Sequence, residues 1–163
     1  MAMMPKKGKA KLRLDETAMK LQASIKMVCF MCNVLEAMKL MERHDRNVYE
    51  WQGWEILVPS LVLFRKKADK KDLMGYLAKS CKIQSTGMMT EKLLMMFLNM
   101  PRQKVLSLSE ASAVIHGADL SSDWRKYFFQ KLADICSILN AMGLLGKVEV
   151  GEDEQVIAYQ YVG

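Results

Sequence analysis

The chain lacks most of the residue patterns on which enzymes and metal proteins depend. Its only histidines, His44 and His116, are not at zinc-finger spacing. Its one C-x-x-C pair, Cys29 and Cys32, has no second pair to complete a four-ligand zinc site. No nucleophile–base pair, paired carboxylates or phosphate-binding glycine loop is recognisable. We therefore expect no metal, no cofactor and no enzymatic activity.

Long hydrophobic runs are also absent. Runs such as Leu93–Leu98 and Ile56–Val58 fall far short of the roughly 20 residues that a membrane span needs. The basic N-terminus is not followed by the apolar segment of a secretory signal. Cys29 and Cys32 lie inside an apolar helical run, which favours structural thiols over a redox pair. We expect no membrane association and a reducing compartment for the unpaired thiols.

Basic residues are in excess, with a net charge of +6 and a pI of about 9.1. Such clusters suit phosphate backbones or a nuclear-import receptor, and the alternative is a solvated tail and linker. The clustered residues are Lys6, Lys7, Lys9, Lys11 and Arg13, and then Arg65, Lys66, Lys67, Lys70 and Lys71.

Two parts of the sequence repeat the same order of blocks: a short helix, a long helix and a two-stranded ribbon. Each ribbon ends in aromatic-x-aromatic-x-Gly. The blocks are 14–21, 33–41 and 49–53 in the first copy, and 108–115, 137–145 and 159–163 in the second. The pattern predicts a mainly α fold with small β-ribbons, of the α+β class.

The second copy has the fuller set of signals. Thr90 is placed to cap an apolar helix that Pro101 ends, and Ser107-x-x-Glu110 is a capping-box pattern. Gly143 marks the end of a long helix. We expect helices at 90–100, 108–115 and 123–142, and strands at 147–150 and 156–159. Three helices followed by a β-ribbon is the winged-helix order.

The first copy matches from its second helix onward. Asp15 is placed to cap a helix at 16–22, and a longer helix is expected at 24–40. Strands at 42–43 and 48–51 would flank a turn at 44–47. The first helix is expected to be missing, because only a basic segment precedes residue 12. The expected domains are a basic tail (1–11), a truncated first domain (12–53), a partly helical linker with Pro59 in its first helical turn (54–83), and a complete second domain (84–163).

At this point the residues resemble a known family. Asn33–Met38, followed by Asn47-x-Tyr49-x-Trp51-x-Gly53, resembles the end of the recognition helix and the wing of E-two-F DNA-binding domains. Ser85–Thr90 resembles the S-L-G-L-L-T start of such a domain, and Leu106–Ser112 resembles its I-S-L-D-D-A-A segment. Two such domains in one chain is the layout of the atypical members, which work without a DP partner. The resemblance therefore implies tandem winged-helix domains over about residues 12–163.

The sequence departs from this family where the family reads bases. The family motif is R-R-x-Y-D, whose arginines make bidentate contacts with guanine. Aligned on Asn33, the first copy has Lys26–Phe30 in that place, and aligned on Ser137, the second has Gln130–Asp134. Neither copy has an arginine at either motif position, and lysine lacks the guanidinium fork. The resemblance thus implies weakened sequence-specific recognition.

Several residues remain candidates for DNA contact, although an exposed lysine or arginine equally often contacts nothing. We expect Met27, Val28 and Phe30 to pack against protein rather than DNA. Asp134 is expected to orient nearby side chains. The wing aromatics are expected to close the core: Tyr49, Trp51, Tyr159 and Tyr161. The DNA-binding candidates are Lys26, Arg43, Arg46, Arg125, Lys126, Gln130 and Lys131.

Two functions follow from these expectations. The first is a nuclear transcription regulator that binds double-stranded DNA, by resemblance a repressor of cell-cycle-type genes, with the two domains pairing within one chain. The second is a non-enzymatic protein-interaction module that presents the apolar residues Met27, Val28, Phe30 and Met31 to a protein partner. Neither function needs a small-molecule substrate.

Overall fold

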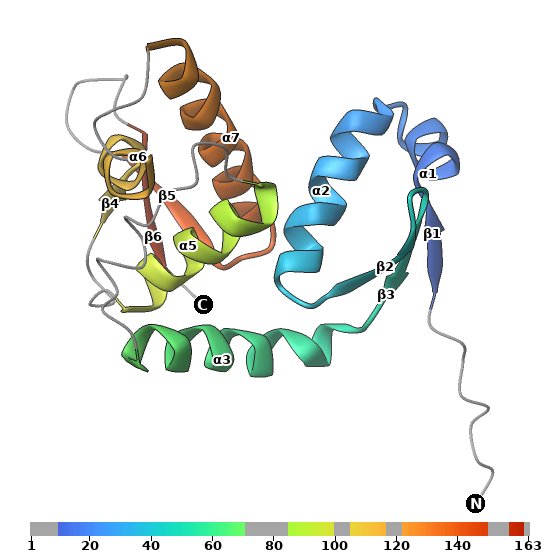
Figure 1. Cartoon of the computed structure of the whole chain (residues 1–163), viewed down its shortest axis with the longest axis horizontal. Helices are drawn as coiled ribbons and strands as arrows, with labels where there is room; N and C mark the ends of the chain where they lie inside the picture. Colours follow the sequence, from blue (N-terminus) through green and yellow to red (C-terminus); the bar gives the residue numbers. More distant parts are fainter. Residues whose placement is uncertain (1–9, 71–84, 100–104, 117–121, 150–156, 162–163) are drawn as a thin grey trace, which may run out of the picture. The chain divides into compact units, whose positions relative to one another are not determined.

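The structure, a computed structural model, describes residues 10–70, 85–99, 105–116, 122–149 and 157–161 (Figure 1). The chain divides into two compact units, Met1–Ser60 and Leu61–Gly163. Each unit is mostly helical and has one small antiparallel sheet, so the α+β prediction is confirmed.

The first unit is built from two helices and a three-stranded sheet. Its strand order is β1-β3-β2, with both pairings antiparallel. A short 3₁₀ turn follows β3, and helix α3 then runs across the boundary between the units. The elements are β1 (Lys11–Arg13), α1 (Leu14–Leu21), α2 (Ile25–Ala37), β2 (Met41–Asp45), β3 (Val48–Trp51), η1 (Trp54–Ile56) and α3 (Leu57–Lys70).

The second unit has a corresponding sheet, with strand order β4-β6-β5, and its helices flank it. Its elements are α5 (Thr86–Asn99), β4 (Leu106–Ser107), α6 (Leu108–His116), α7 (Ser122–Ala141), β5 (Leu145–Glu149) and β6 (Ile157–Tyr161). The apolar helix α5 is buried along almost its whole length, as its sequence predicts.

Strand register shows that the two sheets are copies of one arrangement. Leu12 pairs with Tyr49 in the first sheet, as Leu106 pairs with Tyr159 in the second. In the hairpins, Arg43 lies opposite Tyr49, and Lys147 lies opposite Tyr159. The units therefore share a strand, a short helix, a long helix and a hairpin, in the same order.

The first unit has a core between α1, α2 and its sheet. Leu14 and Ala18 of α1 pack against Val28 and Cys32 of α2, and Tyr49 closes the cluster from β3. No single helix among the described residues is long and apolar enough to cross a membrane. The pair α1 and α2 passes that test only together, across a bend of 113°.

Two predicted helix caps are wrong. Arg13, not Asp15, precedes α1, and Asp15 lies in the first turn, where it accepts a hydrogen bond from Asn47. That bond lowers the pKa of the Asp15 carboxyl. Helix α5 begins before Thr90, and the Oγ of Ser85 caps it by accepting from the amide of Met88 at 3.2 Å. Strand propensity could not reveal β1, because its three residues are fixed by pairing with a distant strand.

Other boundaries agree with the sequence to within a few residues. Ser24 caps α2, Ser107 caps α6, and Pro59 lies in the first turn of α3. Helix α2 ends at Ala37, three residues before its predicted end. Residues 1–9 of the basic tail, Pro101, the 71–83 part of the linker and the second hairpin turn lie outside the described residues.

The long helices of both units end in the same hydrogen-bonded turn. In α7, the amides of Gly143 and Leu144 donate to the carbonyls of Asn140 and Leu139, with Gly143 at φ 80°. This is a Schellman motif, whose left-handed position favours glycine. In α2 the equivalent left-handed residue is Lys39, at φ 66°. The first copy therefore places a side chain where the second has none.

Replacing this residue should stabilise the first unit. We expect Lys39→Gly to raise its free energy of unfolding by about 1 kcal/mol, because a left-handed residue with a Cβ is disfavoured by that amount. The matched control is Gly143→Lys, which should destabilise the second unit. A Cβ at Gly143 meets nothing within 4 Å, so the loss would be conformational. Urea denaturation measures both changes in the free energy of unfolding. A destabilising effect of Lys39→Gly would contradict the left-handed conformation assigned to Lys39.

Candidate nucleic-acid interface

The N-terminal turn of α2 carries the residues that the sequence aligns with the first base-reading motif. Ser24 Oγ accepts a hydrogen bond from the Met27 amide at 3.1 Å, which fixes where the helix begins. Lys26 is exposed, and 57% of Met27 is exposed. Val28 is buried in the core, and Phe30 is partly buried. Val28 therefore packs against protein, as predicted, whereas most of Met27 faces solvent.

Helix α7 carries the second copy of these positions. Gln130 is exposed, and its side-chain amide donates to Asp134 Oδ1 at 3.0 Å. Asp134 thus orients a neighbouring side chain, as its sequence position predicts. The ammonium of Lys131 lies 5.5 Å from the centre of the Tyr127 ring. This helix presents an amide and a lysine at the two positions that the sequence aligns with the motif arginines.

Two further candidates lie in the same helix. Lys126 is exposed near its N-terminal end. Arg125 belongs to α7, but its side chain lies outside the described residues.

The β2–β3 hairpin carries the two candidate arginines of the first unit. Arg43 and Arg46 are both exposed. Arg43 Nε donates to the carbonyl of Asp45 at 3.4 Å, and its guanidinium lies 5.7 Å from the centre of the Tyr49 ring. The backbone amide of Arg46 donates to the Asp45 carboxylate at 2.6 Å, which orders the turn. Both side chains can therefore reach a phosphate from a well-defined hairpin.

A buried tyrosine connects this hairpin to α2. Tyr49 is fully buried, and its hydroxyl donates to Asn33 Oδ1 at 2.8 Å. Burial raises the pKa of Tyr49 to about 12, so the hydroxyl remains a donor. Tyr159 in the second unit is also buried, with a raised pKa, and hydrogen-bonds Ser137 at the position equivalent to Asn33. Both tyrosines therefore close the core, as predicted.

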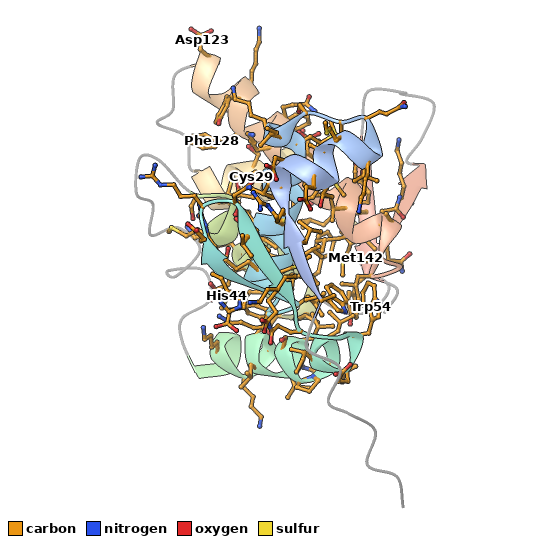
Figure 2. The ribbon with its side chains drawn as sticks, turned by 90° about the vertical axis from the view of Figure 1, so that its right-hand side faces the viewer. Cys29, His44, Trp54, Asp123, Phe128 and Met142 are labelled. Carbon is orange, nitrogen blue, oxygen red and sulfur yellow. The ribbon has the colours of Figure 1, made fainter. Side chains whose placement is uncertain are left out.

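The cysteines do not form a metal or redox site among the described residues. Burial raises the pKa of Cys32 to about 11 and that of Cys136 to about 12, so both remain thiols at neutral pH. Cys29, labelled on α2 in Figure 2, accepts a hydrogen bond from Asn33 at 3.8 Å. None of these three is in a disulfide.

The sequence missed part of an exposed apolar surface around the α1–α2 turn. Because Leu14 and Ala18 direct one face of α1 into the core, Met19 lies off that face. Leu21 is exposed at the C-terminal end of the helix. The predicted apolar face included Val28, which is instead buried. The exposed residues are Met19 (80%), Leu21 (60%), Ile25 (55%), Met27 (57%) and Met31 (39%).

Comparison with known proteins finds distant relatives, and no family model matches the chain. It is 24% identical over 202 residues to transcription factor E2F7 of Mus musculus, an alignment that covers 95% of this chain. The E2F7 proteins of Rattus norvegicus and Bos taurus are 24% and 23% identical over the same share. The chain spans 22% of the length of these relatives.

Proposed function

Starting from this distant relationship to transcription factors of the E-two-F type, we propose that the chain is a tandem winged-helix regulator that binds double-stranded DNA. The observation that carries the proposal is the duplicated unit, in which a long helix is followed by a hairpin of the same strand register. The relatives are transcription factors and not enzymes, so a binding role is the one we propose. By resemblance, the chain is of the atypical, DP-independent type and acts in the nucleus as a repressor of cell-cycle-type genes.

The proposed domains follow the boundaries expected from the sequence. The truncated first domain spans 12–53, where β1 corresponds to β4 of the second unit and no described helix precedes it. The second spans 84–163 and has the additional helix α5. Residues 54–83 link them, and residues 1–11 form the basic tail. Pairing of the two domains within one chain would imitate a heterodimer.

Each long helix is proposed to lie in a major groove, with basic residues at its exposed N-terminal half. In the first unit Lys26 would contact phosphate, while Arg43 and Arg46 would follow the backbone from the hairpin. In the second unit the contacts would come from Arg125, Lys126, Gln130 and Lys131. The amide of Gln130 is already bonded to Asp134, and no guanidinium occupies a motif position, so affinity comes mainly from phosphate. Sequence preference is correspondingly weak.

Salt dependence tests this proposal. Binding to a duplex should weaken linearly on a log–log plot against salt, with a slope of about −0.9 for each phosphate neutralised. We expect Arg43→Ala with Arg46→Ala to make this slope shallower by about 1–2. Arg13→Ala is the matched control, because its guanidinium is already paired with Asp15 and Glu16. Fluorescence anisotropy measures the slopes, and a slope unchanged by the hairpin substitutions would argue against these contacts.

The exposed apolar residues around the α1–α2 turn favour a second candidate function. Met19 and Met27 are more than half exposed, where phosphate contact would favour basic side chains. The alternative is a protein-interaction module that has kept the fold and lost specific DNA binding. Absence of salt-dependent DNA binding, together with a stable protein complex lost on Met27→Glu, would support this alternative.

A further inference from the structure

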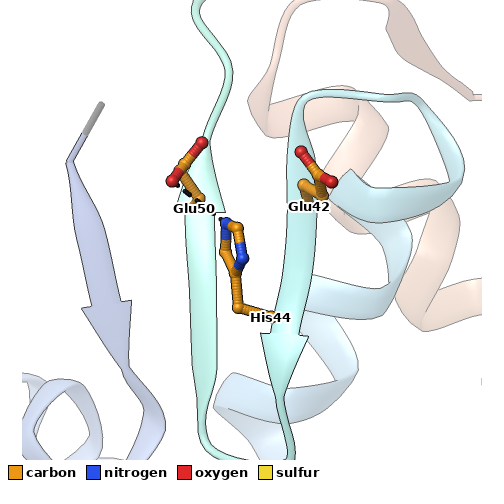
Figure 3. A group of neighbouring side chains, drawn as sticks. All are labelled: Glu42, His44 and Glu50. Atoms are coloured by element: carbon orange, nitrogen blue, oxygen red, sulfur yellow. Dashed lines mark hydrogen bonds and ion pairs between the residues drawn. The ribbon is translucent and has the colours of Figure 1, made fainter. Parts of the chain in front are cut away.

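Three potential ligands of a metal ion meet on the β2–β3 hairpin (Figure 3). They are Glu42 and His44 of β2 and Glu50 of β3. One ligand atom of each lies within 4.8 Å of the other two, and His44 Nε2 is 3.0 Å from Glu50 Oε2. Among the described residues, this is the one group of three such side chains at that spacing.

Strand register explains how these side chains come together. Glu42 and Glu50 lie directly opposite each other, a pairing of like charges that destabilises a hairpin, while Lys11 of β1 lies opposite Glu50 on its other side. His44 is two residues beyond Glu42, and a β-bulge follows between Arg43 and Asp45. Two-residue spacing puts both side chains on one face of a strand, and bulges commonly re-aim a side chain.

The fold itself does not require this cluster. In the second unit, Gly146 and Gln160 occupy the register positions of Glu42 and Glu50. That hairpin forms without an opposed carboxylate pair and has no bulge in its described register. The repulsion in the first unit is therefore a feature of its own side chains, which a bound cation would remove.

We propose that Glu42, His44 and Glu50 form a binding site for a divalent transition-metal ion such as Zn²⁺. Imidazole and carboxylate are ligands that Zn²⁺ accepts, with a water molecule completing a four-coordinate shell. Mg²⁺ and Ca²⁺ prefer all-oxygen sites, so the histidine selects against them. The ion takes the place of the direct hydrogen bond between His44 Nε2 and Glu50 Oε2.

A consequence follows for DNA, and it rests on the proposed function. The two positive charges of the ion cancel the two carboxylate charges beside Arg43. Because repulsion between these carboxylates and phosphate is removed, Zn²⁺ should strengthen the binding of the first hairpin to duplex DNA.

Imidazole NMR of the full chain tests the site without DNA. On titration with Zn²⁺, the ¹⁵N resonances of His44 should shift or broaden saturably, while those of His116 serve as the internal reference. Mg²⁺ should leave His44 unchanged. Zn²⁺ bound by cysteines alone would not shift the ¹⁵N resonances of His44. Equal effects on both histidines, or equal effects of Zn²⁺ and Mg²⁺, would overturn the site.

Variants separate metal binding from the simple His44–Glu50 hydrogen bond. Glu42→Gln should weaken Zn²⁺ binding at least about 10-fold, since even outer-shell partners of a metal contribute that much. It should also raise the melting temperature without metal, because it removes the opposed charges. Glu16→Gln, an exposed carboxylate outside the cluster, should change neither. Unchanged Zn²⁺ affinity in Glu42→Gln would overturn the proposal.

Anisotropy with duplex DNA, with and without Zn²⁺, distinguishes the two proposals. Zn²⁺ that binds His44 but leaves DNA affinity unchanged would overturn the consequence for DNA and leave the site standing. DNA binding without any Zn²⁺ effect on His44 would overturn the site and leave the proposed function standing.

Discussion

Arginines restored at the family's motif positions should give the chain a strong preference for the family's consensus DNA site. The changes are Gln130→Arg with Lys131→Arg in α7, and Lys26→Arg with Met27→Arg in α2. Each regained bidentate contact with guanine should favour the consensus duplex by about 1–3 kcal/mol, which is roughly 5- to 150-fold. Competition between consensus and scrambled duplexes, followed by anisotropy, measures this preference.

The structure indicates that these changes are tolerated. Lys26, Met27 and Gln130 are exposed, so longer side chains there displace no core residue. Asp134, which now accepts from Gln130, remains available to orient an arginine in the same position. Surface substitutions of this kind usually change stability by less than about 0.5 kcal/mol.

The matched control for the restored arginines is Lys126→Arg, which introduces a guanidinium on α7 outside the motif. It should leave the consensus preference unchanged. Folded motif variants that gain no preference would mean that the helices do not reach the groove, and the interaction-module alternative would be favoured. Unfolding on Met27→Arg alone would contradict the exposure of that side chain.

The largest loss of stability should come from Tyr49→Ala. This substitution removes the fully buried ring that closes the core of the first unit and the hydrogen bond to Asn33. Truncation of a buried aromatic residue typically destabilises by about 3–5 kcal/mol. Urea denaturation with hydrogen exchange in the peptides of residues 10–60 locates and measures the effect.

Two further variants separate the contributions of the ring and the hydroxyl. Tyr49→Phe keeps the ring but leaves Asn33 Oδ1 without this donor, which should destabilise by about 1–3 kcal/mol. Met19→Ala, at a side chain 80% exposed, should change stability by less than about 0.5 kcal/mol. A Tyr49→Ala effect no larger than that of Met19→Ala would contradict the assigned core.

Local sequence signals were sufficient for most of the helices and for both hairpins. Ser107 caps a helix as expected, because its side-chain bond joins residues close in sequence. The repeat was detectable because Tyr49 and Tyr159 recur with the same neighbours. Strand β1 was missed, since its pairing with β3 depends on residues that lie far apart in sequence.

The candidate site was less predictable than the fold. Met27 directly precedes the buried Val28, but the helix turns its side chain toward solvent. Hydrophobicity alone did not predict that exposure. Thr90 was the predicted cap of α5, but the helix begins at Thr86 and Ser85 caps it. The Glu42–His44–Glu50 cluster was not predicted, because it depends on cross-strand register and on a bulge. A search for zinc-finger spacing in the sequence detects neither.

The most direct test of the central claim is an anisotropy titration of the unmodified chain with consensus and scrambled duplexes at physiological salt. Tandem winged-helix units with retained lysines and no motif arginines should bind both duplexes. The consensus should be preferred by less than about 100-fold, below the roughly 10³–10⁷ of full specific recognition. Binding that is absent for both duplexes, or a preference above about 100-fold, would contradict the account.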